Sequence, residues 1–599
     1  MSTINDVNIC IATPNGSGSA SANNILFKSI FKMGISCSSK NMFPSNIQSM
    51  PTWYEIRASS DGFGARKDVI DVMVVFNPET GASDVYKLRE NGLLLYDTGA
   101  CEPSWLERGD ILKVGFPATE LSKQIPNAKI RSKLRNMIYV GVIASLFGIS
   151  KEVLIAVLRD TFGDKPEVIE SNLMAIELGS NWVLENQITQ NICQLVAIDG
   201  GNKGKILSDG NTCSALGAIY GGVSVVAWYP ITPSSSLAET LEKYLPELRT
   251  DENDKPTYAI IQAEDEIAAA GIVTGAGWAG SRAMTATSGP GLSLMNEMVG
   301  LAYFTEIPSS YFIVQRGGPS TGLPTRTQQS DILSMYFASH GDTRHVVLLP
   351  YDLQTSFEFG KICLDLADQL QTPVFFASDL DLGMNIRPSD PLYLKDPVLN
   401  RGKLVHEKDI EAQGNQFRRY FDLDGDGIPQ RTIPGNQHPK AVYFCSGAGH
   451  NADAKRSEDP GDYKELLDRL RKKNDTARLL VPQPVVALEN QSRLGIISFG
   501  SSVEAVREAR HRMALDGVLS SHLTLTALPL SPIVRDFVLR HEITLIVEQN
   551  RDGQVASILR MDWPDIATKV DSVLVYDGLP ITAGSVHRLA MEKLGGKLL

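Results

Sequence analysis

The sequence has no closely spaced cysteines. Its seven cysteines are scattered over 599 residues, and no two of them form a C-x-x-C pair. Iron–sulfur clusters and structural zinc ions are held by clustered cysteines, and disulfide frameworks show regular cysteine spacing. We therefore expect neither an iron–sulfur cluster, nor a structural zinc ion, nor a disulfide framework on this chain, and interpret each cysteine as a small buried apolar residue.

Long apolar runs and an excess of basic charge are also missing. The longest apolar stretch, residues 137–149, is shorter than the roughly 20 residues of a membrane-spanning helix, so we expect a buried helix there. No basic segment leads into an apolar core near residue 1, which predicts a cytoplasmic protein. The formal net charge of -12 argues against nucleic acid or an anionic membrane as the main partner. The one basic run, from Arg469 to Lys473, has a helical pattern, and we interpret it as a solvated helix face.

Strand-like and helical segments alternate along most of the chain. Near the start, residues 7–12 predict a strand, which is followed by a glycine-rich turn and an amphipathic helix. Residues 283–287 and 310–315 predict further strands between helices, which is typical of a parallel sheet with helices on both faces. The predicted fold is therefore a multidomain α/β protein. Its predicted domains are residues 1–195, 210–400, 401–489 (a polar arm or insertion) and 490–599, with a linker at residues 199–211.

A stiff loop, YPITPSS (residues 229–235), follows one apolar strand. The carboxyl ends of strands in parallel sheets are where such folds bind ligands, and Thr232 would present its hydroxyl there. Ser236 and Glu239 have the spacing of a capping box, which predicts a helix directly after the loop. The alternative is an ordinary strand–helix connection whose hydroxyl side chains merely cap a helix.

Three acids, Glu264, Asp265 and Glu266, open a predicted helix that is filled with alanine and glycine. The helix dipole favours acids at this end, which alone accounts for two of them. A carboxylate anchored at such a buried helix end is also suited to act as an acid or base.

Two more strand-end loops carry polar groups. Ser288, Gly289 and Gly291 follow residues 283–287, and Arg316 and Arg326 lie in the loop after residues 310–315. An arginine in this position suits bidentate binding of a carboxylate. Four such loops on one sheet predict a single ligand-binding crevice.

The acidic loop at residues 422–427 is similar to two known motifs. Asp422, Asp424 and Asp426 have the spacing that opens a calcium loop, but Ile433 occupies the position of the bidentate glutamate, so the calcium motif is incomplete.

The same loop contains Gly-Asp-Gly (425–427) ahead of Asn451, near the spacing of a thiamine diphosphate motif. That motif needs a helix and a strand after it, and prolines 429, 434 and 439 interrupt the segment, so we reject it.

Taken together, YPITPSS, AEDEIAAAG, TATSGPGLSLM and RGGPSTGLPT resemble the α chain of 2-oxoacid:ferredoxin oxidoreductases. The N-terminal NGSGSASANN and residues 41–57 are similar to the γ domain of that family, here fused ahead of the α part. The resemblance covers nearly the whole chain and is weakest over residues 400–490. It implies that residues 210–400 form the pyrimidine-binding domain of the thiamine diphosphate fold and that residues 490–599 form a transketolase C-terminal-like domain.

The resemblance also implies an activity. The family decarboxylates a 2-oxoacid on thiamine diphosphate, transfers the acyl group to coenzyme A and passes the electrons to ferredoxin. A separate β subunit carries the diphosphate-binding domain, its Mg²⁺ and the [4Fe-4S] cluster, in an expected (αβ)₂ heterotetramer. The fused arrangement favours 2-oxoglutarate as substrate, with pyruvate, a branched-chain oxoacid, or a non-catalytic acyl-CoA-binding role as alternatives.

Residue roles follow from the same resemblance. Glu266 matches the glutamate that binds the aminopyrimidine, with Glu264 as the alternative. Thr232 and Arg316 match the groups beside the substrate carbonyl and its C1 carboxylate, and Arg326 or a β-chain residue would bind the second carboxylate of a dicarboxylate. The other expected cofactor contacts are Tyr229, Pro230, Ile231, Ser288 and Gly289 for thiamine diphosphate, and Gly16, Ser17 and Gly18 for coenzyme A.

Overall fold

The computed structural model describes residues 3–44, 50–394, 398–414 and 417–595, which fall into two compact units. The first unit comprises residues 1–207, 385–391 and 580–585, and the second comprises the remainder. The predicted domain boundaries near residues 400 and 490 both lie inside the second unit and stay predictions. Part of the predicted γ-domain segment at residues 41–57, namely 45–49, lies outside the described residues.

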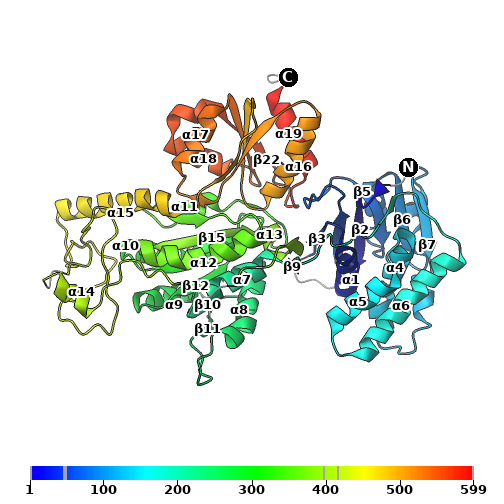
Figure 1. The fold of residues 1–599 in the computed structure, drawn as a ribbon, viewed down its shortest axis with the longest axis horizontal. Coiled ribbons are helices and arrows are strands. Elements are labelled where there is room, and N and C mark those ends of the chain that lie inside the picture. The colour runs from blue at the N-terminus through cyan, green and yellow to red at the C-terminus, as the bar shows by residue number, and fades with distance from the viewer. Residues whose placement is uncertain (1–2, 45–49, 395–397, 415–416, 596–599) are drawn as a thin grey trace. The chain divides into compact units, whose positions relative to one another are not determined.

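The first unit is built around a six-stranded sheet (Figure 1). Its elements are β1 (Thr3–Ile4), β2 (Val7–Pro14), α1 (Ser19–Lys32), β3 (Cys37–Met42), β4 (Pro51–Ala58), β5 (Ile70–Val75), α2 (Gly81–Lys87), β6 (Leu88–Asp97), η1 (Pro103–Leu106), β7 (Leu112–Phe116), α3 (Ala118–Ser122), α4 (Arg131–Phe147), α5 (Lys151–Phe162), α6 (Pro166–Glu185), β8 (Cys193–Gln194), β9 (Ile206–Ser208) and β16 (Arg387–Ser389). The strand order is β3-β4-β2-β5-β6-β7, with β3 and β4 antiparallel to their neighbours and the rest parallel.

Both faces of this sheet are covered. Helices α1, α4, α5 and α6 pack on one face, and α2 with Trp105 packs on the other. Strand β2 is buried from Val7 to Thr13, as expected for a strand with helices above and below it. The strand predicted at residues 7–12 and the buried helix predicted at 137–149 are both confirmed. Among the described residues, no helix combines the length and hydropathy needed to span a membrane.

The second unit contains a seven-stranded and a five-stranded sheet. Its elements are α7 (Gly210–Tyr220), β10 (Val225–Trp228), α8 (Ser235–Leu248), β11 (Ala259–Gln262), α9 (Glu266–Trp278), β12 (Ala283–Thr287), α10 (Gly289–Phe304), β13 (Ser309–Gln315), α11 (Ile332–Tyr336), β14 (Val346–Leu348), α12 (Leu353–Leu370), β15 (Pro373–Asp379), α13 (Leu380–Met384), α14 (Glu407–Ala412), α15 (Pro460–Leu480), β17 (Val485–Ala487), β18 (Leu494–Ser498), α16 (Ser502–Leu515), β19 (Ser520–Thr524), β20 (Ala527–Leu528), α17 (Pro532–Arg540), β21 (Ile543–Glu548), α18 (Gln554–Asp562), η2 (Pro564–Lys569), β22 (Val570–Leu574) and α19, which starts at Ala583 in the first unit and runs to Leu594.

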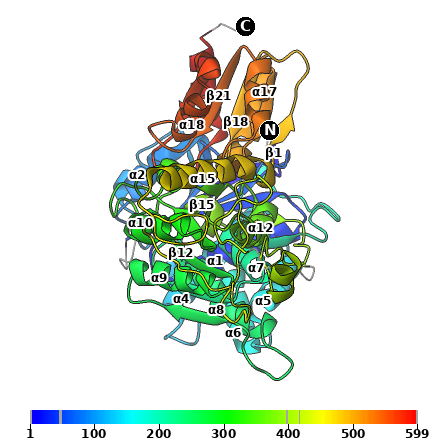
Figure 2. The same cartoon turned by 90° about the vertical axis from the view of Figure 1, so that its left-hand side faces the viewer.

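The larger sheet has the order β11-β10-β12-β13-β15-β14-β20 and is parallel except for β20. Helices α7, α8 and α12 pack on one face, and α9, α10 and α11 pack on the other, where the smaller sheet continues the same core. Figures 1 and 2 show α15 running along the boundary between the two sheets. The strands predicted at 283–287 and 310–315 and their parallel arrangement are confirmed.

The interpretation of the basic run in α15 as a solvated face is wrong for Arg469 and Lys473, whereas Arg471 and Lys472 are exposed. Arg469 and Lys473 are only 8% and 3% exposed. They lie 2.5 and 2.7 Å from the carboxylate of Glu306, which follows α10 and is fully buried. Burial alone would raise the pKa of Glu306, but the two cations hold it well below its usual range. The basic residues therefore neutralise a buried acid.

The predicted capping box after the YPITPSS loop is also wrong. Helix α8 begins at Ser235 with Ser234 at its N-cap, so Ser236 lies inside the helix. The hydroxyl of Ser236 accepts a hydrogen bond from Asn211 Nδ2 at 2.8 Å. The helix nevertheless begins directly after the loop, as the sequence predicts.

Candidate functional site

Four predicted site segments lie at one edge of the seven-stranded sheet. Strands β11, β10, β12 and β13 are adjacent and parallel, so their carboxyl ends share that edge. The segments that follow them begin at Ala263, Tyr229, Ser288 and Arg316. The strand-end crevice predicted from the sequence therefore has a structural basis in this unit.

Glu266 lies between two of these segments. It is the first residue of α9, and Asp265 caps the helix by accepting a hydrogen bond from the Ala268 amide at 2.7 Å. Glu266 is 9% exposed, and its Cγ lies 3.0 Å from the position that a Cβ on Gly291 would take. Glu264 is exposed. The fold therefore directs Glu266, rather than Glu264, against the first turn of α10.

Arg316 is bound to the YPITPSS loop. Its Nη1 donates to the Thr232 carbonyl at 2.8 Å, and its Nη2 donates to the Thr321 carbonyl at 3.2 Å. Arg316 is 7% exposed, and its Nε is buried without a hydrogen-bond partner within the described ranges. Burial lowers the pKa of Arg316, and nearby Asp331 opposes that effect. Arg316 and the backbone of Thr232 are thus brought together, and the Nε of Arg316 is left unpaired.

The turn between β12 and α10 leaves no room for side chains. Ser288 is fully buried at the N-cap of α10. A Cβ on Gly289 would lie 2.6 Å from Asp331 Oδ2, and a Cβ on Gly291 would lie 2.0 Å from Thr287 Oγ1. Only glycine fits at these two positions while their neighbours stay in place.

Asp331 is a residue of this edge that the sequence analysis missed. It occupies the N-cap position of α11, yet its side chain makes no cap hydrogen bond, and its Oδ2 is buried without a partner in the described part of the chain. Burial raises the pKa of Asp331 to about 6, against the lowering effect of Arg316. An aspartate ahead of an apolar segment is typical of a helix cap, so the sequence gave no signal for this placement.

The remaining predicted residues are less enclosed. Tyr229 is 37% exposed, Pro230 is exposed and Ile231 is half-buried. The guanidinium of Arg326 donates to the Thr325 carbonyl at 2.9 Å, and its side-chain base lies against Gly578. No described contact joins it to the guanidinium of Arg316.

Four buried polar atoms at this edge have no hydrogen-bond partner among the described residues: Thr287 Oγ1, Ser288 Oγ, Arg316 Nε and Asp331 Oδ2. Buried polar groups are almost always paired, so several orphans in one place indicate groups that a ligand completes. The hydroxyl, guanidinium and carboxyl groups among them fit a bound polar cofactor and an anionic substrate.

In the first unit, the predicted Gly16–Ser17–Gly18 turn lies at the N-terminus of α1. Gly16 and Gly18 have φ angles of 80° and 85°, which favour glycine. The helix has no side-chain cap, and Ser17 Oγ is buried without a partner inside the described ranges. An uncapped helix N-terminus beside an unpaired hydroxyl suits an anion.

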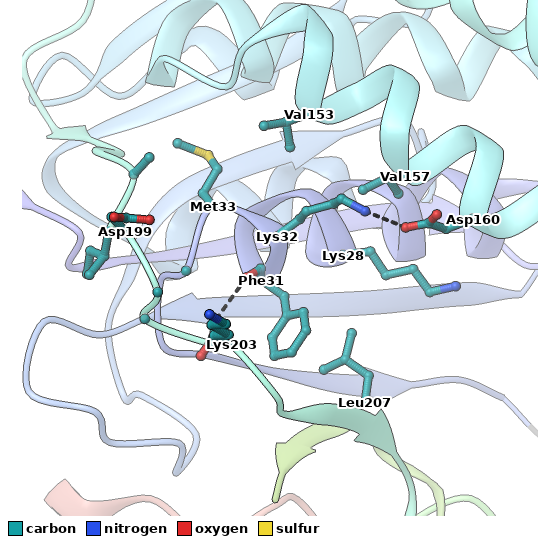
Figure 3. A pocket seen from close by; sticks show the side chains of 16 residues that line it. Lys28, Phe31, Lys32, Met33, Val153, Val157, Asp160, Asp199, Lys203 and Leu207 are labelled. Atoms are coloured by element: carbon teal, nitrogen blue, oxygen red, sulfur yellow. Dashed lines mark hydrogen bonds and ion pairs between the residues drawn. The ribbon is translucent and has the colours of Figure 1, made fainter. Parts of the chain in front are cut away.

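A cavity of about 790 Å³ lies at the opposite end of the same helix (Figure 3). Its wall is apolar at Phe31, Val153 and Val157, and it carries the amines of Lys28 and Lys32. The segment that follows α6 closes it, because the Ile198 amide donates to the Met33 carbonyl at 2.8 Å. The Gly16–Gly18 turn does not line this cavity.

Two acids of the loop at residues 422–427 are paired with a lysine from an earlier segment of the chain. The Nζ of Lys403 lies 2.5 Å from Asp424 and 2.7 Å from Asp426, among the carboxylates that stand close enough to share an ion. Within the described residues, the loop is a series of bends and no strand directly precedes it.

Comparisons with known proteins agree with this geometry. Residues 216–417 match the family described as pyruvate flavodoxin/ferredoxin oxidoreductase, thiamine diphosphate-binding, and residues 8–182 match pyruvate ferredoxin/flavodoxin oxidoreductase. A 2-oxoacid:ferredoxin oxidoreductase α subunit of Aeropyrum pernix is 28% identical, covering 98% of both chains. One from Saccharolobus solfataricus is 30% identical, covering 78% of this chain and 73% of the relative.

A solved structure is similar over nearly the same extent. It is the 2-oxoglutarate:ferredoxin oxidoreductase from Magnetococcus marinus with 2-oxoglutarate, coenzyme A and succinyl-CoA bound. The match has a TM-score of 0.88 at 29% identity and covers 98% of this chain and 100% of the other.

Proposed function

Because this chain belongs to the 2-oxoacid:ferredoxin oxidoreductase α-subunit family, we propose that it oxidatively decarboxylates 2-oxoglutarate to succinyl-CoA and CO₂, or catalyses the reverse, with ferredoxin as electron carrier. The observation that carries the proposal is the shared strand-end edge of the seven-stranded sheet, which holds Glu266, Thr232 and Arg316 together with four unpaired buried polar atoms. The 2-oxoglutarate assignment is supported by the substrate named for the Magnetococcus marinus structure.

The cofactor role of the crevice belongs to Glu266 and the turn after β12. Glu266 would hydrogen-bond the aminopyrimidine of thiamine diphosphate and hold a proton there, while Ser288, Gly289 and the backbone of residues 229–231 line the ring. When bound, thiamine diphosphate supplies the carbon nucleophile for the keto group and accepts the electron pair that CO₂ leaves. The low exposure of Glu266 excludes water from that contact.

The substrate role belongs to Thr232 and Arg316. Arg316 would bind the C1 carboxylate through its unpaired Nε, and Thr232, whose carbonyl accepts from Arg316, would place its hydroxyl beside the keto carbon. A second carboxylate needs a second cation, supplied by Arg326 or by the partner chain. Arg326→Met would distinguish these sources, because it should raise the KM for 2-oxoglutarate only if Arg326 makes that contact.

Coenzyme A would bind with its phosphates at the Gly16–Ser17–Gly18 turn, where the α1 N-terminus is uncapped. The diphosphate-binding domain, its Mg²⁺ and the [4Fe-4S] cluster would belong to a β subunit, in an (αβ)₂ heterotetramer that docks ferredoxin on the β side.

The test is co-expression of this chain with its candidate β subunit. Coenzyme A-dependent reduction of a low-potential acceptor is measured with 2-oxoglutarate, pyruvate and a branched-chain 2-oxoacid. We expect turnover with 2-oxoglutarate, and a loss of at least about 100-fold in kcat for Glu266→Gln, since the amide cannot exchange the proton. Glu264→Gln is the matched control and should keep wild-type activity, because Glu264 is exposed.

Two outcomes would contradict the proposal. If the complex turned over only pyruvate or only a branched-chain oxoacid, that oxoacid would replace 2-oxoglutarate as the assigned substrate. A cofactor-loaded complex that turns over no oxoacid would indicate an acyl-CoA-binding role instead of catalysis.

A further inference from the structure

The placement of Asp331 is not explained by any role assigned so far. Its backbone amide donates to Gln315 Oε1 at 3.0 Å, at the end of β13. Its carboxyl does not cap α11 but lies against Gly289, the first residue of α10. An aspartate usually gains stability by capping its own helix, so this side chain is held in a different role.

The loop that carries Asp331 is fixed by residues from the smaller sheet's side of the unit. Asn550 Nδ2 donates to the Gln329 carbonyl at 3.0 Å. Gln554 Nε2 donates to the Ser330 carbonyl at 2.7 Å, and Gln554 Oε1 accepts from the Leu333 amide at 2.9 Å. These hydrogen bonds fix the backbone on both sides of Asp331. The fixed backbone keeps the carboxyl of Asp331 buried, although burial disfavours its charged form.

The charged surroundings of Asp331 are simple. Arg316, from the end of β13, is the cation whose field acts on it. Glu266 of α9 is an acid on a neighbouring helix, and it lies against Gly291, two residues after the Gly289 against which Asp331 lies. Gln315 and Gln554 contact the backbone around Asp331 and are neutral. The unpaired Asp331 Oδ2 and the unpaired Arg316 Nε therefore belong to the same strand-end edge.

We propose that Asp331 controls how tightly the crevice binds its oxoacid. Ionised Asp331 competes with the C1 carboxylate of the substrate for Arg316, whereas protonated Asp331 donates a hydrogen bond to that carboxylate. The inference rests on the proposed function, because it takes Arg316 as the carboxylate-binding residue. It makes Asp331 a specificity and positioning residue for an anionic substrate.

Two consequences can be measured. The pKa of Asp331 is raised to about 6, so at neutral pH the free site is mostly ionised. Binding an anion beside it favours the neutral form, so each binding event takes up a proton from solvent. Affinity for the oxoacid therefore falls as pH rises above about 6, by up to about tenfold per pH unit.

The experiment uses the αβ complex loaded with thiamine diphosphate and 2-hydroxyglutarate, an analogue that lacks the reactive keto group. Calorimetric titrations at pH 7.5 in two buffers of different ionisation enthalpy give the number of protons taken up. We expect about one per site for the wild type and none for Asp331→Asn, whose dissociation constant should also be independent of pH between 6 and 8. Asp331→Ser serves as a second variant if the first does not assemble.

The matched control is Asp352→Asn, which removes the N-cap carboxylate of α12 that accepts from the Thr355 amide at 2.7 Å. It should keep the wild-type proton uptake. Equal proton uptake by wild type and Asp331→Asn, or a pH-independent wild-type affinity, would overturn the inference, as would failure of the wild-type complex to bind the analogue. A complex that shows the expected proton uptake but turns over no oxoacid would contradict the proposed function alone.

Discussion

At the scale of single residues, Gly291 couples backbone packing to the site. A Cβ there would lie 2.0 Å from Thr287 Oγ1 and 3.0 Å from Glu266 Cγ, so α10 would have to shift away from both. We expect Gly291→Ala to lower the free energy of unfolding by about 1–3 kcal/mol. We also expect kcat of the complex to fall about 100-fold, because Glu266 is displaced. Urea unfolding of the lone chain and the acceptor-reduction assay measure the two effects.

Gly271 provides the matched control, because it lies inside α9 and nothing stands within 4 Å of an added Cβ. Gly271→Ala should raise the free energy of unfolding of the lone chain by about 0.5–1 kcal/mol through helix propensity alone. A loss of stability as large as that of Gly291→Ala would show that steric contact is not the cause.

Asp331 makes stability depend on pH in an unusual direction. Its pKa is raised from 3.8 to about 6 in the folded chain, so the folded state binds more protons than the unfolded state between these values. The contribution of Asp331 to the free energy of unfolding is therefore fully present below about pH 4 and is lost as the pH rises to about 6. Asp331→Asn should be more stable than wild type above pH 6 by about 1–3 kcal/mol, and equally stable near pH 4. Parallel pH profiles of urea unfolding for the two proteins would contradict this.

At the scale of elements, local pattern predicted the strands well. Residues 283–287 match β12 at both ends, because Arg282 and Ser288 bound a short apolar run. The same reasoning failed for α15, since its basic residues are matched by an acid that lies 163 positions away in the sequence, at Glu306. A pattern within one helix carries no information about such a partner.

The ion cluster of α15 should dominate the stability of that helix. Glu306→Ala leaves Arg469 and Lys473 buried without a counter-charge, and we expect a loss of about 3–5 kcal/mol in urea unfolding. Asp468→Asn on the same helix breaks an exposed pair with Lys464 and should change stability by less than about 0.5 kcal/mol. Similar losses in both variants would show that the buried pairing is unimportant.

The ion cluster around Glu306 also makes the stability of the folded chain fall at acid pH. Because the folded pKa of Glu306 is depressed below its ordinary 4.5, its contribution is present above that pH and is lost on further acidification.

At the scale of the whole molecule, the described residues offer candidate groups for one side of the proposed cofactor. Glu266 and the β12–α10 turn would supply the polar contacts we propose, whereas Asp424 and Asp426 of the 422–427 loop are paired with Lys403. We expect the lone chain to show no stoichiometric binding of thiamine diphosphate with Mg²⁺ in calorimetry, and the αβ complex to show it. Stoichiometric binding by the lone chain would contradict the division of the site between two subunits.

The sequence identified Glu266, Thr232 and Arg316 as candidates chiefly through the family resemblance of the segments that carry them, since the local pattern at Thr232 also fitted an ordinary strand–helix connection. It missed Asp331, because only the folded chain shows that this aspartate turns away from its own helix towards Gly289. Long-range placement of this kind depends on the packing of the second sheet and has no local pattern.

The hydrogen bonds from Asn550 and Gln554 mean that codons far from the Asp331 codon affect the same site. Asn550 lies 221 positions after Gln329, whose carbonyl it holds, and Gln554 holds the carbonyl of Ser330. A codon change that replaces either amide side chain would remove a hydrogen bond that holds the Asp331 loop. Such a change would then affect the same site as a change in the Arg316 loop, although the two codons lie far apart in the gene.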